Sequence, residues 1–408
     1  MLLIADHKAH PVKKPCFIPT LLLVAVVARA EVPETTGVFP LSARELATAR
    51  DRLAHGDASL APALAELRAE ADRALQLRPM SVMDKLRTTP SGDKHDYISL
   101  APYWWPDPKN PKGPYIRHDG LRNPEAENEK FSDHAAWAKV STAIRTLGLA
   151  YYFTGNEAYA EHAAKLARTW FLDPATRMNP NLNFGQYVTG VNEGREEGII
   201  EFLSLVPACD SLTLIGTSPA WTQKDVAAFH AWLGAYFTWL TESPTGRAEA
   251  AALNNHGTCD DVQIAYIALL LGKTDYAKKL LVDDLQKRLA QQVEPDGRQP
   301  LELARTKSLN YSLKNLEGLF ALAGLGDRVG IDWWHYATPD GRSLRVALRY
   351  LAPYADPAKP WIQSDVIAGD RTRLFALFAQ ALHHGDDPLF REMMHFSPAD
   401  ARWHLLWP

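Results

Sequence analysis

The chain has few cysteines and lacks the short motifs that mark metal, nucleotide and hydrolase sites. Three cysteines in 408 residues are too few for a scaffold held by disulfides. The absence of HExxH, Cys-x-x-Cys and EF-hand patterns gives no indication of a dedicated metal site. The sequence also has no glycine-rich phosphate loop and no Gly-x-Ser-x-Gly segment, which argues against nucleotide binding and against an α/β-hydrolase. We therefore expect neither a cofactor nor a metal.

The first 30 residues have the layout of a secretory signal peptide. Lys13-Lys14 precedes an apolar run, and Ala28-Arg29-Ala30 then provides a cleavage site. The apolar run is too short to span a bilayer as a helix of the mature protein. We expect cleavage near Glu31 and a periplasmic or secreted protein with no membrane association after cleavage. Residues 31–408 are then expected to form one domain.

The charge balance is slightly acidic, with 44 lysines and arginines against 48 aspartates and glutamates and a net charge of −4. Loss of the first 30 residues removes four basic residues and one acidic residue, so the mature chain is more acidic still. Such a protein is a poor candidate for nucleic-acid binding. An anionic substrate would have to be attracted locally, by a few arginines and helix N-termini. We expect the two remaining cysteines, Cys209 and Cys259, to be buried and unpaired.

Apolar residues recur at helical spacing through most of the mature chain. The pattern predicts helices over residues 42–56, 60–77, 135–153, 158–171, 196–206, 222–240, 262–271, 276–292, 309–322, 343–351 and 371–382. Successive helix pairs without any βαβ alternation predict an all-α fold, an incomplete (α/α) toroid of helical hairpins. The loops at one rim of such a ring are where we expect binding residues to concentrate.

Residues 79–130 interrupt the helical pattern and are rich in proline, glycine and aromatic residues. A loop of this length inside a compact domain is usually functional or disordered, and its aromatic content argues for order. We expect it to form the wall of a cleft at one rim, although a loop pinned by its own aromatic side chains is the alternative. Its candidate substrate contacts are Lys94, Tyr97, Tyr103, Trp104 and Trp105.

Two amides and an imidazole, Asn254-Asn255-His256, come just before a long apolar helical run. If either asparagine caps that helix, His256 lies in its first turn, where backbone N–H groups and the helix dipole favour negative charge. Uncharged donors at a helix N-terminus suit a carboxylate ligand. The alternative is an ordinary helix cap with a histidine of no special function.

A second polar cluster precedes the apolar pair Ile199-Ile200, which we interpret as another helix start at the same rim. Its candidate substrate contacts are Gln186, Tyr187, Asn192 and Arg195. Arg195 stands between acidic residues, so a structural ion pair is the favoured alternative for it.

A third cluster combines Arg305 with Tyr311. With Ser308 as the N-cap of the next helix, its leucines turn toward the core, and Tyr311 and Asn315 share a different face. A tyrosine near a helix N-terminus and an arginine has its phenolate stabilised, as a tyrosine base requires. A half-buried structural tyrosine is the alternative.

Two other classes of protein remain open on these residues. A glycoside hydrolase on a similar helical toroid would need a pair of carboxylates, and the available ones are Glu193, Glu196, Glu197 and Asp260. A non-catalytic glycan-binding protein would use the aromatic side chains without any base.

The combination of these stretches resembles the alginate lyase superfamily of (α/α)-toroid polysaccharide lyases. The resemblance rests on Tyr103-Trp104-Trp105-Pro106-Asp107-Pro108, on Asn254-Asn255-His256-Gly257-Thr258, and on Arg305 with Tyr311. It extends over residues 84–322. Within the superfamily the chain looks closest to polysaccharide lyase family 38, with family 5 more distant.

The resemblance implies β-elimination at a 4-linked uronic acid within an anionic polysaccharide. It assigns neutralisation of the C6 carboxylate to Asn255, His256 and Arg305, next to Asn254, because proton abstraction at C5 places further charge on that group. Tyr311 would remove the C5 proton and return a proton to O4. Where these two groups lie on opposite faces of the sugar, His256 is the alternative base.

The expected substrate is alginate, in particular polymannuronate, with glucuronan as the alternative. The family-5 form follows Asn-Asn-His with bulkier residues than Gly257-Thr258, so the alternative stays open. Discrimination between these polymers would depend on contacts to ring hydroxyls away from C5.

Overall fold

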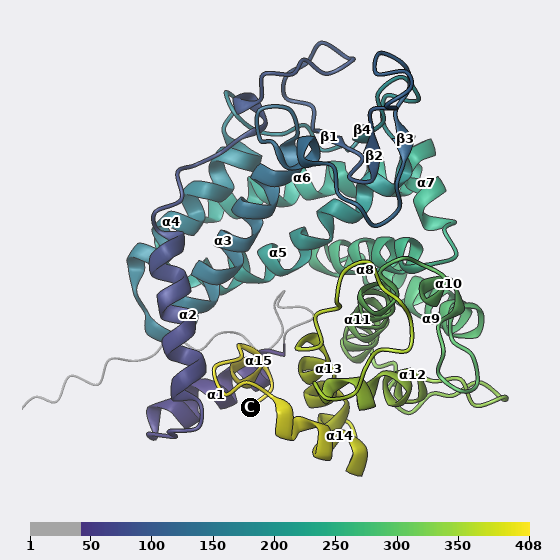
Figure 1. The fold of residues 1–408 in the computed structure, drawn as a ribbon. Helices are drawn as coiled ribbons and strands as arrows, with labels where there is room; N and C mark the ends of the chain where they lie inside the picture. Colours follow the sequence, from purple (N-terminus) through teal and green to yellow (C-terminus); the bar gives the residue numbers. More distant parts are fainter. Residues whose placement is uncertain (1–41) are drawn as a thin grey trace, which may run out of the picture. The chain divides into compact units, whose positions relative to one another are not determined.

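The computed structural model describes residues 42–408, and these belong to one compact unit, Val32–Pro408. The expected signal peptide lies outside the described residues. The unit is built mainly of helices joined as hairpins (Figure 1), so the predicted all-α class is confirmed.

The helices that carry the fold follow the predicted order along the chain. Their bounds are α1 (Ala43–Ala54), α2 (Ala61–Ala74), α3 (Asp133–Thr154), α4 (Glu157–Ala167), α5 (Leu205–Leu214), α6 (Gln223–Glu242), α7 (Pro244–Ala250), α8 (Asn255–Leu270), α9 (Thr274–Gln292), α10 (Pro300–Leu303), α11 (Ser308–Asp327), α12 (Leu344–Leu351), α13 (Arg373–His383), α14 (Pro388–Met393) and α15 (Trp403–Leu406). Helix α3 packs against α4 and α5, and α8 packs against α9 and α11. Antiparallel neighbours of this kind bury the apolar stripe that each helix carries.

The starts of three helices near the cavity differ from the predictions in ways that matter for the site. The segment after Arg195 begins as a 3-10 helix, η4 (Glu196–Ser204), and becomes α-helical only at Leu205. Helix α8 begins at Asn255, ahead of the predicted Val262, because its polar first turn is invisible to apolar periodicity even though Asn254 caps it. Ser308 is the first residue of α11 rather than its cap.

The cap of α11 comes from a distant part of the chain. The backbone N–H groups of Ser308 and Leu309 donate to the two carboxylate oxygens of Asp365, at 2.8 and 3.0 Å. A carboxylate at a helix N-terminus satisfies otherwise unpaired donors and complements the helix dipole. The start of α11 is therefore fixed by the loop before α13.

The 79–130 region is ordered by short strands and 3-10 turns. Its elements are η1 (Val82–Asp84), β1 (Ile98–Leu100), β2 (Trp104–Trp105), β3 (Ile116–Arg117) and η2 (Pro124–Glu127). Strand β1 pairs in parallel with β4 (Phe184–Tyr187), and β2 pairs antiparallel with β3. The region is thereby connected both to itself and to the segment that follows α4.

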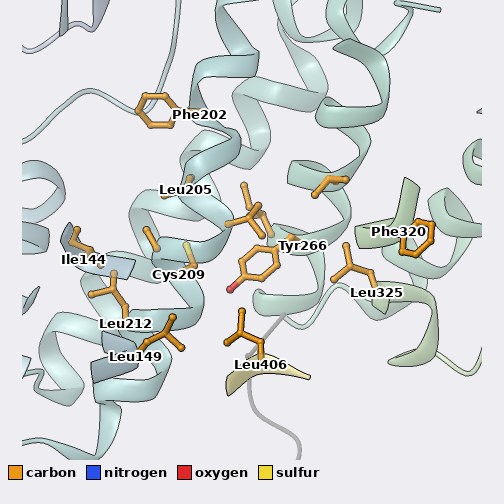
Figure 2. Close-up of a cluster of buried hydrophobic side chains, with 14 of the residues drawn as sticks. Ile144, Leu149, Phe202, Leu205, Cys209, Leu212, Tyr266, Phe320, Leu325 and Leu406 are labelled. Carbon is orange, nitrogen blue, oxygen red and sulfur yellow. The ribbon is translucent and has the colours of Figure 1, made fainter. Parts of the chain in front are cut away.

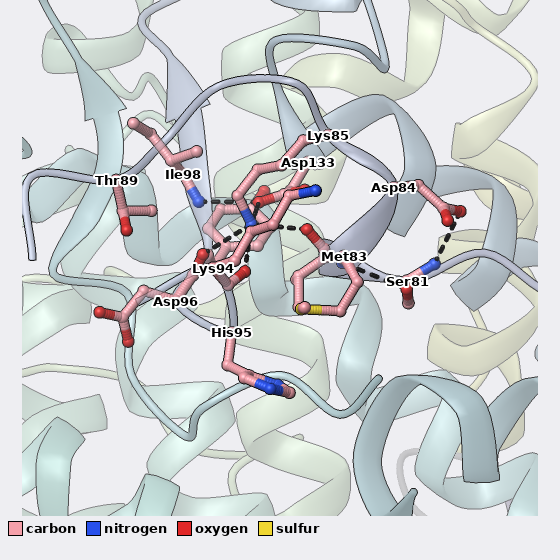
Figure 3. A network of polar contacts seen from close by, with 12 residues as sticks. Ser81, Met83, Asp84, Lys85, Thr89, Lys94, His95, Asp96, Ile98 and Asp133 are labelled. Atoms are coloured by element: carbon pink, nitrogen blue, oxygen red, sulfur yellow. Dashed lines mark hydrogen bonds and ion pairs between the residues drawn. The ribbon is translucent and has the colours of Figure 1, made fainter. Parts of the chain in front are cut away.

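A buried lysine fixes the first part of this region to α3 (Figure 3). The Lys85 ammonium donates to the backbone carbonyls of Val82, Lys94 and Asp96 at 2.7, 2.8 and 2.9 Å, and it lies 3.1 Å from Asp133. A buried ammonium is tolerated only when its donors are paired in this way. Since Asp133 begins α3, the network sets where the loop leaves the helices.

The core fills the space between α3, α5, α8 and α11. In Figure 2, Tyr266 of α8 lies between side chains of α5, such as Leu205 and Cys209, and those of α11, such as Leu325. Cys209 and Cys259 are both buried and unpaired, as predicted. Among the described helices, Glu196–Thr217 is long and apolar enough to cross a membrane, but 67% of its apolar window is buried in the protein, as in a core helix.

Candidate active site

A cavity of about 1170 Å³ opens beside the 79–130 region and continues between α3, α8, α11 and α13. The basic side chains on its wall are Arg117, Arg122, Arg145, Arg195, Arg305, Lys314 and Arg373. The acidic ones are Glu196, Glu197, Glu201, Glu249 and Glu317. Although the chain as a whole is acidic, this cavity therefore carries more cationic than anionic side chains, and it suits an anionic ligand.

Tyr311 lies in the first turn of α11, and its hydroxyl connects Arg305, which follows α10, with Tyr103 of the 79–130 region. Its hydroxyl accepts a hydrogen bond from Arg305 Nη2 at 3.1 Å and donates one to the Tyr103 hydroxyl at 2.9 Å. The Arg305 guanidinium also lies over the Tyr311 ring, 4.0 Å from its centre. Asp119 holds Arg305 from the other side, with 2.9 Å between Oδ1 and Nη2, and accepts a bond from Thr306 as well.

The protonation of Tyr311 differs from the expectation of a stabilised phenolate. Burial raises the pKa of Tyr311 well above its usual range, and the hydrogen bond to Tyr103 raises it further, whereas Arg305 lowers it. The expectation was wrong because it counted the arginine charge but not the loss of water around the ring. Asp119 also offsets much of that charge. Burial acts to raise the pKa of Asp119, but its bonds from Arg305, Arg117 and Thr306 together keep that pKa below its usual range.

The two asparagines at the start of α8 have different positions. Asn254 lines the cavity and caps α8, with its side-chain oxygen accepting from His256 N at 3.2 Å. Asn255, predicted to contact the substrate carboxylate, is fully buried behind the cavity wall. Its backbone N–H and its amide donate to the two carboxylate oxygens of Glu302 at 2.7 and 2.8 Å. Asn254 is therefore the amide that can reach a ligand, and Asn255 holds it in place.

His256 lies on the cavity wall with a buried acid behind it. Its Nδ1 is 2.7 Å from Glu249 Oε1, and among residues 42–408 its Nε2 has no hydrogen-bond partner. Burial lowers the pKa of His256 to about 4 and raises the pKa of Glu249 to about 9, the nearby Lys314 and Glu197 adding to these respective shifts. At neutral pH both groups are therefore uncharged. The Glu249 carboxyl then donates to Nδ1, which leaves the imidazole proton on Nε2.

A third group of cavity residues comes from the β4 segment and the start of η4. Gln186 and Arg195 line the cavity, and Arg195 donates to Gln186 Oε1 at 2.7 Å and to Glu197 at 2.9 Å. The structural ion pair considered for Arg195 is thus present beside its place on the wall. Gln186 has a φ of 45°, the only left-handed residue other than glycine among those described, and such backbone strain tends to occur at functional sites.

The remaining predicted contacts divide between the cavity wall and its support. Tyr103 and Trp104 line the cavity. The predicted contacts that do not line the cavity are Lys94, Tyr97, Trp105, Tyr187 and Asn192. The amide of Asn192 closes its own loop onto Val188, and Tyr187 lies under the Arg87 guanidinium. The aromatic side chains of this group were expected to leave ring faces exposed, and Asn192 was expected to face the rim, whereas here these side chains order the loops.

Tyr97 and Trp105 show how the loop aromatics are used instead. The Tyr97 hydroxyl, fully buried, donates to the cavity residue Glu201 at 2.7 Å. The Trp105 indole donates to the Leu121 carbonyl at 2.9 Å, and the Lys94 carbonyl accepts from Lys85. Both alternatives considered for the 79–130 region are therefore present together: it borders the cavity and is pinned by its own side chains.

Four residues of the site could not be identified from the sequence. Asp119, Glu249 and Glu302 hold Arg305, His256 and Asn255, and Lys314 lies on the cavity wall one turn after Tyr311. Of these four, only Lys314 could have been suspected from the sequence, because it lies one helical turn after Tyr311. The acids are recognisable only once the partners are known.

Two of the four carboxylates considered for a glycoside hydrolase do not reach the cavity. Asp260 is fully buried in the core, where burial raises its pKa well above the usual range. Glu193 is not on the cavity wall, although Glu196 and Glu197 are. Within residues 42–408, no group of three or more histidine, cysteine, aspartate or glutamate side chains could hold a metal ion.

Helical hairpins around an Arg–Tyr pair and a helix-start histidine define an (α/α)-toroid polysaccharide lyase, which is a carbon–oxygen lyase. The chain belongs to the alginate lyase family, whose profile, described as Alginate lyase, matches residues 81–361. A comparison with curated proteins finds no match.

Solved structures agree with this family and with the toroid fold. An alginate lyase from Bacteroides ovatus is 38% identical with a TM-score of 0.85, over 91% of this chain and 99% of that one. Alginate lyase A1-III from Sphingomonas species A1 is 17% identical with a TM-score of 0.54, over 89% and 94%. A variant of A1-III complexed with a tetrasaccharide is 16% identical with a TM-score of 0.56, over 93% and 97%. The A1-III structures show likeness of fold alone.

Proposed function

We propose that the protein cleaves alginate, with polymannuronate as the preferred polymer, by β-elimination at a 4-linked uronate. The observation that carries the proposal is the Tyr311 hydroxyl, which bridges Arg305 and Tyr103 inside a cationic cavity. The names of the relatives support the substrate class, since the Bacteroides ovatus protein is an alginate lyase and an A1-III variant was crystallised with a tetrasaccharide.

The first requirement of the reaction is a neutralised C6 carboxylate, because the C5 proton is acidic only when the charge that develops there is stabilised. We assign this task to the Asn254 amide and to His256 Nε2–H, which face the cavity as uncharged donors. Glu249 keeps His256 in the donating tautomer, so His256 acts as a donor to the carboxylate and not as the base. Arg305 supplies positive charge on the same wall.

The second requirement is a group that moves the proton. Tyr311 as phenolate removes the C5 proton, the C4–O4 bond breaks as the C4–C5 double bond forms, and the phenol then protonates the departing O4. The tyrosine ends as it began, so the cycle balances without another reactant. Because its pKa is raised in this structure, only a small fraction is ionised at neutral pH, and the rate should increase with pH.

Within the family, we infer that the chain is closer to polysaccharide lyase family 38 than to family 5. The contrast between 38% identity to the Bacteroides ovatus enzyme and 17% to A1-III supports a large distance from the latter. Gly257 and Thr258 after the Asn-Asn-His stretch support it too. Gly257 has no room for a side chain, since a Cβ there would lie 2.2 Å from the Ala252 carbonyl oxygen.

The decisive experiment is to incubate the protein with polymannuronate, polyguluronate and glucuronan and to follow ultraviolet absorbance. β-Elimination leaves a 4,5-unsaturated uronate that absorbs, with polymannuronate expected to react fastest. New reducing ends without absorbance would indicate a hydrolase, and binding without either product would indicate a glycan-binding protein. A signal from glucuronan alone would make that polymer the substrate.

We also propose that the protein is exported to the periplasm or secreted, by cleavage of residues 1–30. The support is the order of basic, apolar and small residues in that segment. Mass spectrometry of the protein recovered from cells should give a mature chain that begins near Glu31. Recovery of the full-length chain from the cytoplasm would contradict the proposal.

A further inference from the structure

The cavity extends well beyond Tyr311, along one face of α11. The residues of α11 that are partly exposed to it are Tyr311, Lys314, Glu317 and Ala321, while the residues between them are buried. At the rise of an α-helix, this face is about 15 Å long. The catalytic cluster occupies only its first turn, so most of the cavity length has no role in the proton transfer.

The opposite wall of this extension is one face of α3. Its cavity residues His134, Ala138, Thr142 and Arg145 follow helical spacing over about 16 Å. Ala138 and Thr142 are exposed and small, so this wall leaves room for a ligand. Arg145 lies at the inner end, where the charges of Arg402, Asp210, Glu70 and Glu317 all affect its pKa.

Two cations of the extension have no ion-pair partner among the described residues, whereas Arg373 beside them, and Arg402 outside the cavity wall, are both paired. Arg373 binds Glu317, with 2.8 Å between Nε and Oε1, and Arg402 forms an ion pair with Glu70. By contrast, no hydrogen bond or ion pair joins the side chain of Lys314 or Arg145 to another described residue. An unpaired guanidinium inside a protein is costly.

The charge of Arg145 is nonetheless retained. Burial, and next the proximity of Arg402, lower the pKa of Arg145 to about 10, so its guanidinium is charged at neutral pH. A guanidinium binds a carboxylate through two parallel N–H donors, which makes it a specific as well as a strong partner. An anionic ligand that entered the extension would satisfy it.

We propose that the inner part of the cavity is a second uronate subsite, in which Lys314 and Arg145 bind carboxylates of sugars beyond the cleaved bond. The proposal rests on the polyuronate lyase function proposed above. A neutral polysaccharide would gain nothing from these two cations, whereas a polyuronate carries a carboxylate on every sugar. The subsite would therefore select both for charge and for chain length.

The test uses Arg145→Gln, with Lys139→Gln as the matched control. Lys139 lies on the same helix and also loses one positive charge, but it is on the outer surface and paired with Glu129. Initial rates are measured on a length series of mannuronate oligosaccharides and on polymannuronate. For Arg145→Gln we expect KM to rise about tenfold or more on long substrates, with kcat little changed. The shortest cleavable oligosaccharides and all substrates of the control should behave as wild type.

Binding can be separated from turnover in the Tyr311→Phe background. Calorimetry with a long mannuronate oligosaccharide should give a Kd that rises about tenfold or more when Arg145→Gln is added. If Arg145→Gln does not fold, as judged by thermal melting, Arg145→Lys and Lys314→Gln provide the same comparison. The Lys314 variant should affect shorter substrates than the Arg145 variants do.

Two results would overturn the subsite. One is an unchanged KM at every length for both the Arg145 and the Lys314 variants, and the other is an equal loss at every length, which would indicate a purely structural role. Neither result resembles failure of the proposed function, in which the wild-type protein itself would form no unsaturated product from any polyuronate.

Discussion

The two sides of the cavity are built in different ways. On the α8 side, Asn254 and His256 are held by Glu302 through Asn255 and by Glu249, both acids being 1% exposed. On the α11 side, Tyr311 and Arg305 are held by Tyr103 and Asp119, which are only partly buried.

The two sides also differ in how far apart along the sequence their interacting residues lie. Glu249 and His256 are 7 residues apart, whereas Arg305 and Asp119 are 186 apart and Tyr311 and Tyr103 are 208 apart. The donor side is therefore built from contacts of shorter range, up to the 47 residues between Asn255 and Glu302. The proton-transfer side exists only when the 79–130 region is closed over the helices. We infer that the donor side is rigid and that the base side depends on the order of one loop region.

The largest expected effect comes from the base side. Tyr311→Phe removes the group that exchanges protons with C5 and O4, and we expect kcat to fall about 10²- to 10⁴-fold. The ring remains, so the fold, the melting temperature and polymer binding should be retained. Tyr103→Phe is the matched control, since it loses a hydroxyl on the same hydrogen bond without losing the base. Comparable residual activity in both variants would show that Tyr311 is not the base.

The next effect tests the donor side. Glu249→Ala leaves His256 free to adopt either tautomer, and we expect kcat/KM on polymannuronate to fall about 10- to 100-fold, the range found for partners that orient metal-binding histidines. Glu249→Gln can still donate to Nδ1 and should keep most of the activity. If the glutamine variant is as impaired as the alanine variant, an ionised Glu249 is required instead and His256 is the better candidate for the base.

The pH profile should distinguish the two sides as well. As pH rises through about 9, Glu249 loses its proton. The imidazole then takes the tautomer with its proton on Nδ1, which donates to the Glu249 carboxylate, and Nε2 becomes an acceptor that repels the substrate carboxylate. We expect KM to increase several-fold above that pH while kcat continues to rise with ionisation of Tyr311. In Glu249→Gln the increase in KM should be absent. An identical alkaline rise in both proteins would assign it to another group.

The same pKa shift predicts a trend in stability. The pKa of Glu249 is raised from about 4.5 to about 9 on folding, so between these values the folded state holds a proton that the unfolded state has lost. Its contribution to stability is complete below pH 4.5 and is lost as pH rises to 9. Thermal melting without substrate should show a smaller decline over this interval for Glu249→Gln than for wild type. An equal decline would mean that Glu249 is ionised in the folded protein.

The sequence was sufficient for the helices and for the positions that carry polar side chains at helix starts. Apolar periodicity identified α3, α6, α9 and α11 closely, and the asparagine pair correctly indicated the start of α8. Short helices such as α7 were not predicted, because its seven residues begin with proline and have no apolar period.

What could not be predicted is which polar residue faces the cavity and which supports it. Asn254 and Asn255 are the same residue type at adjacent positions, and only the position of Glu302 determines that Asn255 is the supporting one. In the same way, Tyr97 and Tyr103 both belong to an aromatic loop, yet one is buried against Glu201 and the other meets Tyr311. Such choices depend on partners far away in sequence, and a pattern of local spacing contains no information about them.

The smallest expected effect concerns the contact that joins the loop region to the base side. Asp119→Asn keeps the size of the side chain but removes its charge, so Arg305 loses an ion pair and Thr306 keeps a possible acceptor. Two effects then oppose each other: Arg305 is less firmly positioned, but its full charge acts on Tyr311 and should lower the pKa of that phenol. We expect kcat/KM at neutral pH to fall only a few-fold, in line with the modest strength of a partly exposed ion pair, and the alkaline rise in kcat to move to lower pH. Arg298, which pairs with Asp296 on the surface, gives a control, since Asp296→Asn should change neither quantity. A loss as large as that of Tyr311→Phe would mean that the loop region does not merely support the base but determines whether the site forms at all.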